Sequence, residues 1–139
     1  MHSELIRVAT GSREVVHDLT ETCRRFVAES AHAAHGDGLL HVFVPHATAG
    51  VAILETGAGS DTDLLAVLED LLPRDFGWRH RHGSPGHGRD HVLPALIPPY
   101  ASIPVIARAL MLGTWQSVCL IDTNVDNPDR QVRLSWIPG

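Results

Sequence analysis

Near its C-terminus the chain reads Gln131-Val132-Arg133-Leu134-Ser135-Trp136-Ile137. Apolar and polar residues alternate through this segment, so that Val132, Leu134 and Trp136 point one way and the polar residues between them point the other. Alternation with a period of two is typical of a strand that buries one face. The segment therefore predicts a closing strand that packs one side against a core.

Strand patterns recur along the chain around two helical patterns. Apolar and β-branched runs indicate further strands at residues 4–10, 39–44, 51–55, 103–106, 109–112 and 117–122. Early strands, two main helices and a closing run of strands predict an α+β fold with a mostly antiparallel sheet. The 139 residues suit a single domain, residues 1–139, and no internal repeat or linker divides them.

Two helices are expected from apolar residues that recur at helical spacing. The first begins at a capping box formed by Asp18 and Glu21 and continues through Ala34. The second begins at a capping box formed by Ser60 and Asp63, and Pro73 ends it. We expect the apolar stripes of both helices to be buried in the core.

Composition and charge narrow the range of partners. There are 16 acidic and 11 basic residues, a formal net charge of −5, and no basic block, which argues against nucleic acid as the main partner. No apolar run approaches the roughly 20 residues that a membrane span needs, and the first residues lack the pattern of a secretory signal. Cys23 and Cys119 lie in apolar patterns far apart in the sequence. We therefore expect a cytoplasmic protein with buried thiols and no membrane partner.

The unusual feature of the composition is its 10 histidines. Four of them, His80, His82, His87 and His91, crowd into residues 73–91, which are rich in glycine and proline and lack periodicity. A long loop of this kind is commonly functional or disordered. Neutral imidazole binds zinc and similar metals, but a site needs about three or four converging ligands. The spacing leaves two interpretations open, a solvated histidine-rich loop and a metal site.

Other stretches carry polar groups that either the fold or a ligand must satisfy. In Leu112-Gly113-Thr114-Trp115-Gln116, a strand-entry turn with a buried tryptophan and a ligand site are both possible. Glu55 follows four apolar residues, so it is either an ordinary charge at a strand end or a partly desolvated base or ligand. Arg130 lies in a charged turn, where it either pairs with an aspartate or binds a phosphate.

Taken together, these stretches resemble one protein family. The chain carries, in order, His46-Ala47-Thr48-Ala49-Gly50, Glu55, Trp78-Arg79-His80, His91 and Leu112-Gly113-Thr114-Trp115-Gln116. In this order and with these gaps it resembles the YjbQ-like family, small bacterial and archaeal proteins known as secondary thiamine-phosphate synthases. The resemblance runs from about Leu5 to the end of the chain.

The resemblance implies an α+β sandwich that assembles as a homotrimer, with the polar motif residues in a cleft near a subunit boundary. It also implies an ability to join the pyrimidine pyrophosphate and thiazole phosphate halves of thiamine, so that the expected ligand is a small phosphorylated metabolite. The residues that match the family motif are His46, Thr48, Glu55, His80, His91, Thr114, Trp115, Gln116 and Arg130.

From the resemblance we expect a divalent metal, zinc or magnesium, held by His46, His80 and His91 and assisting the departure of pyrophosphate. Glu55 and His46 are the expected catalytic residues. The expected substrate-binding residues are Thr48, Thr114, Trp115, Gln116 and Arg130. Two alternatives are a metal-dependent hydrolase that uses the same site and a non-catalytic trimer that binds a phosphorylated metabolite or a metal.

The chain departs from the family pattern around the expected site. Leu54 replaces the asparagine that usually precedes the glutamate, and Arg108-Ala109 replaces a glycine–arginine pair. The acidic ending is stretched over residues 122–130, and the loop carries two extra histidines, His82 and His87. Because these changes surround the expected site, the resemblance supports the fold more firmly than the substrate.

Overall fold

Two antiparallel sheets form the frame of the protein, and the computed structural model describes residues 1–31 and 36–139. Sheet A has the strand order β1 (His2–Ala9), β8 (Asp129–Pro138), β3 (Gly38–Phe43), β5 (Tyr100–Ile106) and β6 (Ala109–Leu110). Sheet B has the order β2 (Val15–Asp18), β7 (Ser117–Asp122) and β4 (Ala49–Leu54). Every hydrogen-bonded pair of neighbouring strands is antiparallel, which confirms the α+β fold with antiparallel sheets.

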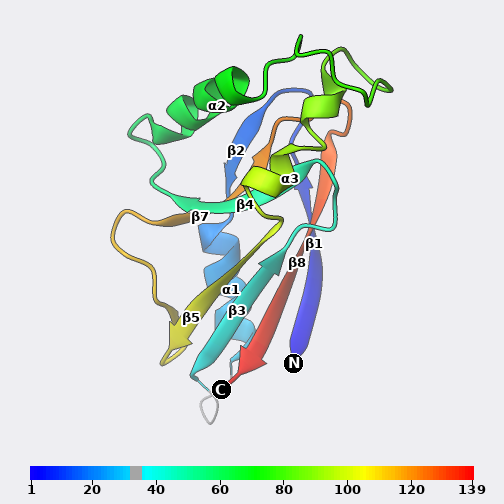
Figure 1. Cartoon of the computed structure of the whole chain (residues 1–139). Helices are drawn as coiled ribbons and strands as arrows, with labels where there is room; N and C mark the ends of the chain where they lie inside the picture. Colours follow the sequence, from blue (N-terminus) through cyan, green and yellow to red (C-terminus); the bar gives the residue numbers. More distant parts are fainter. Residues whose placement is uncertain (32–35) are drawn as a thin grey trace.

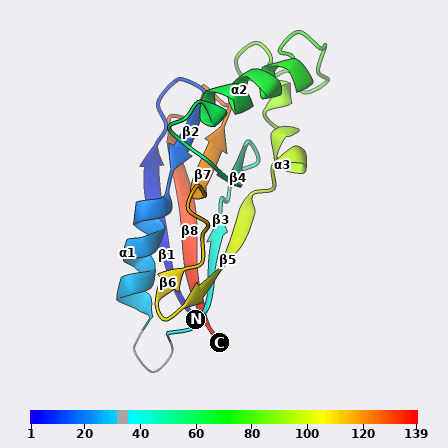
Figure 2. The same ribbon diagram turned by 90° about the vertical axis from the view of Figure 1, so that its left-hand side faces the viewer.

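One long helix lies in the same layer as sheet B, and the other forms an outer layer over it. Helix α1 (Thr20–Ser30) follows β2 and packs with sheet B against the inner face of sheet A, whereas α2 (Ser60–Leu71) covers the opposite face of sheet B (Figure 2). The 3₁₀ turn η2 (His87–Arg89) and the short helix α3 (Leu93–Leu96) follow α2. Both termini lie at one end of the molecule and the loop between α2 and α3 lies at the other (Figure 1). Among the described residues, no helix combines the length and apolar character needed to cross a membrane.

Strand β7 lies between the layers and is buried on both faces. Val118 and Leu120 belong to the hydrophobic cluster shared with sheet A and α1, whereas Cys119 and Ile121 belong to the cluster shared with α2 and α3. All four side chains are 0% exposed. Because neither face meets water, this strand is continuously apolar instead of alternating.

Strand β8 shows the alternation that the sequence predicts. Val132, Leu134 and Trp136 are buried in the cluster beneath sheet A, and β8 pairs with β1 on one side and β3 on the other. The other predicted strands agree within a few residues at their ends, although the strand expected at 109–112 is limited to Ala109–Leu110.

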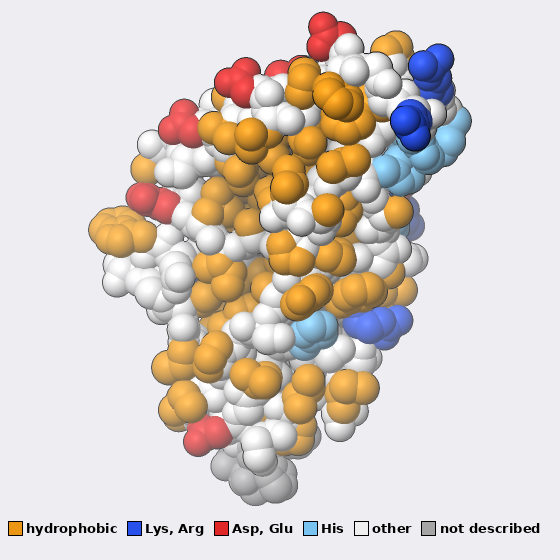
Figure 3. Space-filling view, viewed as in Figure 1, with side chains coloured by type: hydrophobic (Ala, Val, Ile, Leu, Met, Phe, Trp, Pro, Cys, Tyr) orange, Lys and Arg blue, Asp and Glu red, His pale blue; other side chains and the backbone are white. Residues whose placement is uncertain are grey.

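The outer face of sheet A, which points away from α1, is rich in apolar side chains that remain open to solvent in a single chain (Figure 3). We call this surface the open face. Its large apolar members, each 37–52% exposed, are Leu5, Leu39, Phe43, Tyr100, Ile106 and Ile137. Contiguous apolar surface of this kind marks an interaction surface more often than a solvated one.

The helices begin differently from the predicted capping boxes. The N-cap position of α1 is Leu19, and the side chain of Asp18 accepts the N–H of Thr20 at 2.8 Å. The N-cap position of α2 is Gly59, whose φ of +110° suits glycine. Both capping-box predictions are therefore wrong by one residue. The first helix ends at Ser30 and Ala31 is extended, so the predicted continuation toward Ala34 is also wrong, although residues 32–34 themselves lie outside the described part of the chain.

The glycine of the segment 46–50 permits a close approach between two parts of the chain. A Cβ atom on Gly50 would lie 2.3 Å from the carbonyl oxygen of Ile97. Without it, the segment that precedes β5 lies against β4, where the N–H of Val51 donates to the carbonyl oxygen of Pro98 at 2.8 Å.

The two cysteines are buried free thiols, as the sequence predicts. Burial raises the pKa of both Cys23 and Cys119 to about 12, so neither is present as a reactive thiolate at neutral pH.

Candidate metal centre

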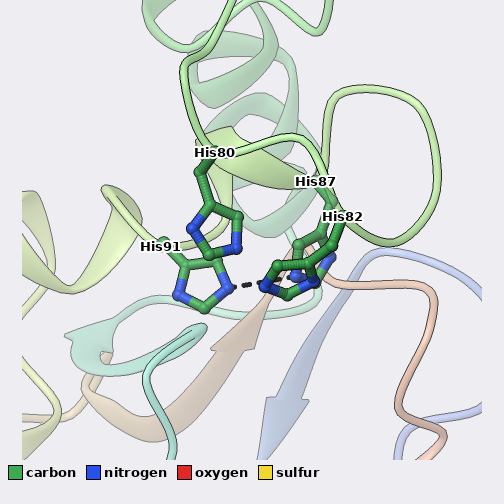
Figure 4. A group of neighbouring side chains, drawn as sticks. All are labelled: His80, His82, His87 and His91. Atoms are coloured by element: carbon green, nitrogen blue, oxygen red, sulfur yellow. Dashed lines mark hydrogen bonds between the residues drawn. The ribbon is translucent and has the colours of Figure 1, made fainter.

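Four histidine side chains converge in the loop between α2 and α3 (Figure 4). His80 and His82 lie in the irregular part of this loop, His87 lies in η2, and His91 precedes α3. Their ligand atoms all lie within 4.8 Å of one another, and the Nε2 atoms of His87 and His91 are 3.0 Å apart. The fold thus brings His80 and His91, which the sequence placed in one site, together with His82 and His87.

The environment of two members of the cluster, His80 and His91, favours the neutral imidazole. His87 is buried, His91 is half-buried, and His80 and His82 are exposed. Desolvation, followed by the charges of the neighbouring histidines, lowers the pKa of both His80 and His91 below the usual value. Neutral imidazole carries the lone pair that binds a metal, so these rings are ready to coordinate at neutral pH and are protonated only as the pH falls.

The donors of the cluster are imidazole nitrogens alone, and they fit one class of cation. Imidazole suits zinc, copper, iron and nickel, whereas magnesium selects oxygen ligands. Zinc–nitrogen bonds of about 2.0 Å at tetrahedral angles place the nitrogens about 3.3 Å apart. The 3.0 Å between His87 and His91 is close to this separation. Of the two metals expected from the sequence, zinc fits this donor set and magnesium does not.

A buried arginine anchors η2 to the rest of the fold. Arg89 is 1% exposed, and its guanidinium donates to Glu14 in the β1–β2 turn at 2.8 Å and to the carbonyl oxygen of Leu72 at 3.2 Å. It also donates to Glu69 of α2. These contacts fix the turn that carries His87 against two other elements.

The loop between β7 and β8 holds His87 from the other side. Oδ2 of Asp126 lies 2.9 Å from Nδ1 of His87 and also accepts the backbone N–H and the hydroxyl of Ser84, each at 3.1 Å. Nδ2 of Asn124 lies 3.1 Å from the same Nδ1 atom. The hydrogen bonds, first among them that from the Ser84 backbone, hold the pKa of Asp126 below its usual value, so this side chain is a carboxylate at neutral pH.

A cavity of about 400 Å³ adjoins the cluster. Its lining includes His80 and His87 together with Trp78, Ser84 and the exposed Arg81. Histidine and arginine side chains gather at this end of the molecule, over the loop between α2 and α3 (Figure 3). A small anionic molecule can therefore reach the histidines from a side that carries positive charge.

His46, Thr48 and Arg130 form a separate polar group near the end of β7. Arg130 is 2% exposed and donates to Asp122 at 2.6 and 2.9 Å and to the hydroxyl of Thr48 at 2.9 Å. His46 accepts the backbone N–H of Gln131 at 2.8 Å, and desolvation together with the Arg130 charge lowers its pKa. Of the two interpretations of Arg130, the structure shows the pair with an aspartate, and the pair is buried. Within one chain, His46 is not among the converging histidines.

Glu55 and the segment 114–116 lie at the other end of sheet B. β4 and β7 pair along their whole lengths, so Glu55, just after β4, lies near the start of β7, whereas the histidine cluster adjoins the loop after β7. A rise of about 3.3 Å per residue separates these two ends by roughly 17 Å. Trp115 is 73% exposed, so the interpretation as a buried tryptophan is wrong. A second cavity of about 400 Å³, lined in part by Thr114 and Gln116, opens beside it.

The sequence marks His82 and His87 as two extra histidines of the loop, and it marks residues 122–130, which include Asn124 and Asp126, only as a stretched acidic segment. The signal for the two histidines was present, since four histidines crowd into one short segment. No local pattern marks the other two residues, because their contacts with η2 arise only when segments more than 30 residues apart pack together.

The chain is similar over nearly its whole length to one group of proteins. The family described as "UPF0047 protein YjbQ-like" matches residues 4–139. A UPF0047 protein of Mycobacterium tuberculosis is 55% identical over 139 residues, 100% of both chains. The solved structure of an uncharacterized YjbQ/UPF0047 family protein from Clostridium acetobutylicum has a TM-score of 0.84 at 27% identity and covers 96% of this chain and 99% of that one. A YbjQ-like protein of unknown function from Sulfolobus solfataricus shares the fold, with a TM-score of 0.90 at 21% identity over 99% and 97% of the two chains.

Removing Arg130 should destabilise the protein strongly, because it leaves the Asp122 carboxylate, 0% exposed, without its partner. We expect Arg130→Leu to lower the free energy of unfolding by about 3–5 kcal/mol. The control is Arg7→Leu, which breaks the exposed pair with Asp129 and should cost at most about 1 kcal/mol. Urea denaturation measures both values, and similar losses in the two variants would contradict a supporting role for the buried pair.

Proposed function

Since the chain belongs to the YjbQ-like UPF0047 family, we propose that it is a metal-assisted enzyme of the secondary thiamine-phosphate synthase type. The observation that supports this proposal is the convergence of four histidines beside a cavity lined by Arg81. A zinc-type ion held by these rings supplies a Lewis acid for a pyrophosphate leaving group. Arg81 provides positive charge for phosphate oxygens, and the neutral imidazoles leave the charge of the metal uncompensated.

The proposed assembly is a homotrimer, and it explains why the motif residues lie at two ends of one chain. Glu55, as base or ligand, and Trp115, as a surface for stacking on a heteroaromatic ring, lie at the far end of sheet B from the histidines. In the trimer an adjacent copy supplies this second group to the histidine site. The open face provides apolar surface for the contact. The proposed location is the cytoplasm, which suits two free buried thiols.

One observation favours the alternative of a non-catalytic metal-binding trimer. Four protein ligands complete the tetrahedral coordination of zinc, as in structural sites, whereas catalytic sites keep one position for water or substrate. A metal-dependent hydrolase is the other alternative, since a metal centre beside an arginine-lined cavity also suits the attack of water on a phosphate ester.

The metal proposal predicts one divalent transition metal per chain in zinc-loaded, tag-free protein after gel filtration, measured by mass spectrometry of the metal. His91→Ala should lose the metal, because it removes one of the four converging ligands. His46→Ala is the matched control and should retain it, because that ring accepts a backbone N–H elsewhere. Loss of metal in His46→Ala would instead support the set of His46, His80 and His91, and wild-type protein without metal would contradict both sets.

The synthase proposal predicts that the zinc-loaded protein releases pyrophosphate only when the pyrimidine pyrophosphate and the thiazole phosphate are both present. Glu55→Ala should reduce the rate by about 100-fold or more if it acts as the base, whereas the control Glu29→Ala, an exposed residue on α1, should not change it. Phosphate release from either compound alone would favour the hydrolase. Thermal stabilisation by the compounds without turnover would favour the binding protein.

The assembly proposal predicts a particle of about 45 kDa by light scattering, three times the 15.1 kDa chain. Phe43→Arg, in the middle of the open face, should reduce this mass because a charge would be buried in the contact. Leu71→Arg, which replaces an exposed leucine of α2 outside that face, is the control and should leave the mass unchanged. A wild-type mass of a single chain would contradict the assembly.

A further inference from the structure

In His87, two other side chains lie beside Nδ1, the ring nitrogen that points away from His91. Its Nδ1 atom lies 2.9 Å from a carboxylate oxygen of Asp126 and 3.1 Å from the amide nitrogen of Asn124. Its Nε2 atom faces His91 at 3.0 Å. Since the ring is only 6% exposed, these groups decide which nitrogen carries the proton.

The two neighbours of Nδ1 favour opposite protonation states of this atom. The amide of Asn124 is oriented by its own contacts, because its Oδ1 accepts the backbone N–H groups of Asp126 and Asn127 at 2.8 and 3.0 Å. Its NH₂ group therefore points toward His87 and can only donate. On its own, Asn124 would favour a bare Nδ1 and place the proton on Nε2, where a metal must bind.

The carboxylate of Asp126 can only accept a hydrogen bond, so it favours a proton on Nδ1. In the neutral ring the lone pair then lies on Nε2. Its oxygen is also fixed in place, because Ser84 donates both its backbone N–H and its hydroxyl to the same Oδ2 atom. Carboxylates in this position set the tautomer and orientation of metal-binding histidines in general.

We infer that Asp126 is a positioning residue of the metal centre, which accepts the Nδ1–H of His87 and thereby keeps the Nε2 lone pair available to the cluster. In the metal-free protein this assigns the hydrogen bond between the two rings, with His91 donating from its Nε2–H to the Nε2 of His87. The inference rests on the proposed metal centre, but its tautomer part is testable without any metal.

The test compares Asp126→Ala with the wild-type chain. The variant removes the oxygen that accepts from Nδ1, so that the NH₂ donor of Asn124 alone remains beside this atom. Zinc affinity, measured by competition with a chromogenic chelator, should fall by about 10- to 100-fold. Long-range ¹H–¹⁵N spectra of the metal-free protein should show His87, assigned with His87→Ala, as the Nδ1–H tautomer in the wild type and shifted toward Nε2–H in the variant. Asp126→Glu, which restores the charge, should recover the wild-type tautomer.

The control is Asp129→Asn, in which an exposed carboxylate of the same region is neutralised outside the contacts of His87. It should change neither the zinc affinity nor the spectrum. Unchanged affinity and tautomer in Asp126→Ala would overturn the role of Asp126 while leaving the metal centre intact, and so would weaker binding without a change of tautomer. Wild-type protein that does not bind zinc would overturn the proposed centre itself, whatever the tautomer.

Discussion

The buried ion pair between Asp122 and Arg130 is the interaction on which the rest of the structure depends. It joins the last residue of β7 in sheet B to the second residue of β8 in sheet A, at 2.6 and 2.9 Å. Removing both charges from water costs several kcal/mol for each ion, and the two direct hydrogen bonds and the contact with Thr48 offset that cost. The ion pair therefore fixes both ends of the loop between β7 and β8, because these ends cannot move apart without separating the two charges.

The same loop connects the ion pair to the histidine cluster. Asp122 accepts the backbone N–H of Asn124 at 3.0 Å, the side chain of Asn124 accepts the backbone N–H of Asp126 at 2.8 Å, and the Asp126 carboxylate contacts His87. On the opposite side Arg89 ties η2 to α2 and to the β1–β2 turn. The loop between α2 and α3 thus takes a defined path without a long helix or strand, because buried polar contacts replace the apolar stripe that orders regular elements.

The sequence predicts those parts of the fold in which burial is periodic. The alternation at β8 and the apolar stripe of α1 reflect which side chains meet the core, so they appear in the order of residues. The stripe expected in the second helix is buried only in part, because Leu68 and Leu72 are buried whereas Leu71 is 62% exposed. What it does not predict depends on the path of irregular chain. The N-cap residue of α2 is Gly59, with φ +110°, one residue before the expected Ser60. The exposure of Trp115 follows from a loop conformation that no period encodes. The convergence of the four histidines likewise depends on the path of an irregular loop, so the sequence does not predict which of them meet.

The cluster is asymmetric, and this asymmetry bears on the choice between a non-catalytic metal-binding protein and an enzyme. His87 and His91 belong to the buried side, where Arg89 and the β7–β8 loop fix the turn between them, whereas His80 and His82 are exposed. The cavity with Arg81 is lined by one histidine from each side, His80 and His87. A four-ligand zinc site is closed only while all four ligands stay in place. If a metal were bound, an anionic oxygen that replaced one of the exposed imidazoles would leave the buried half undisturbed. Four converging histidines would therefore still admit an anionic ligand on the side where the positive charge lies.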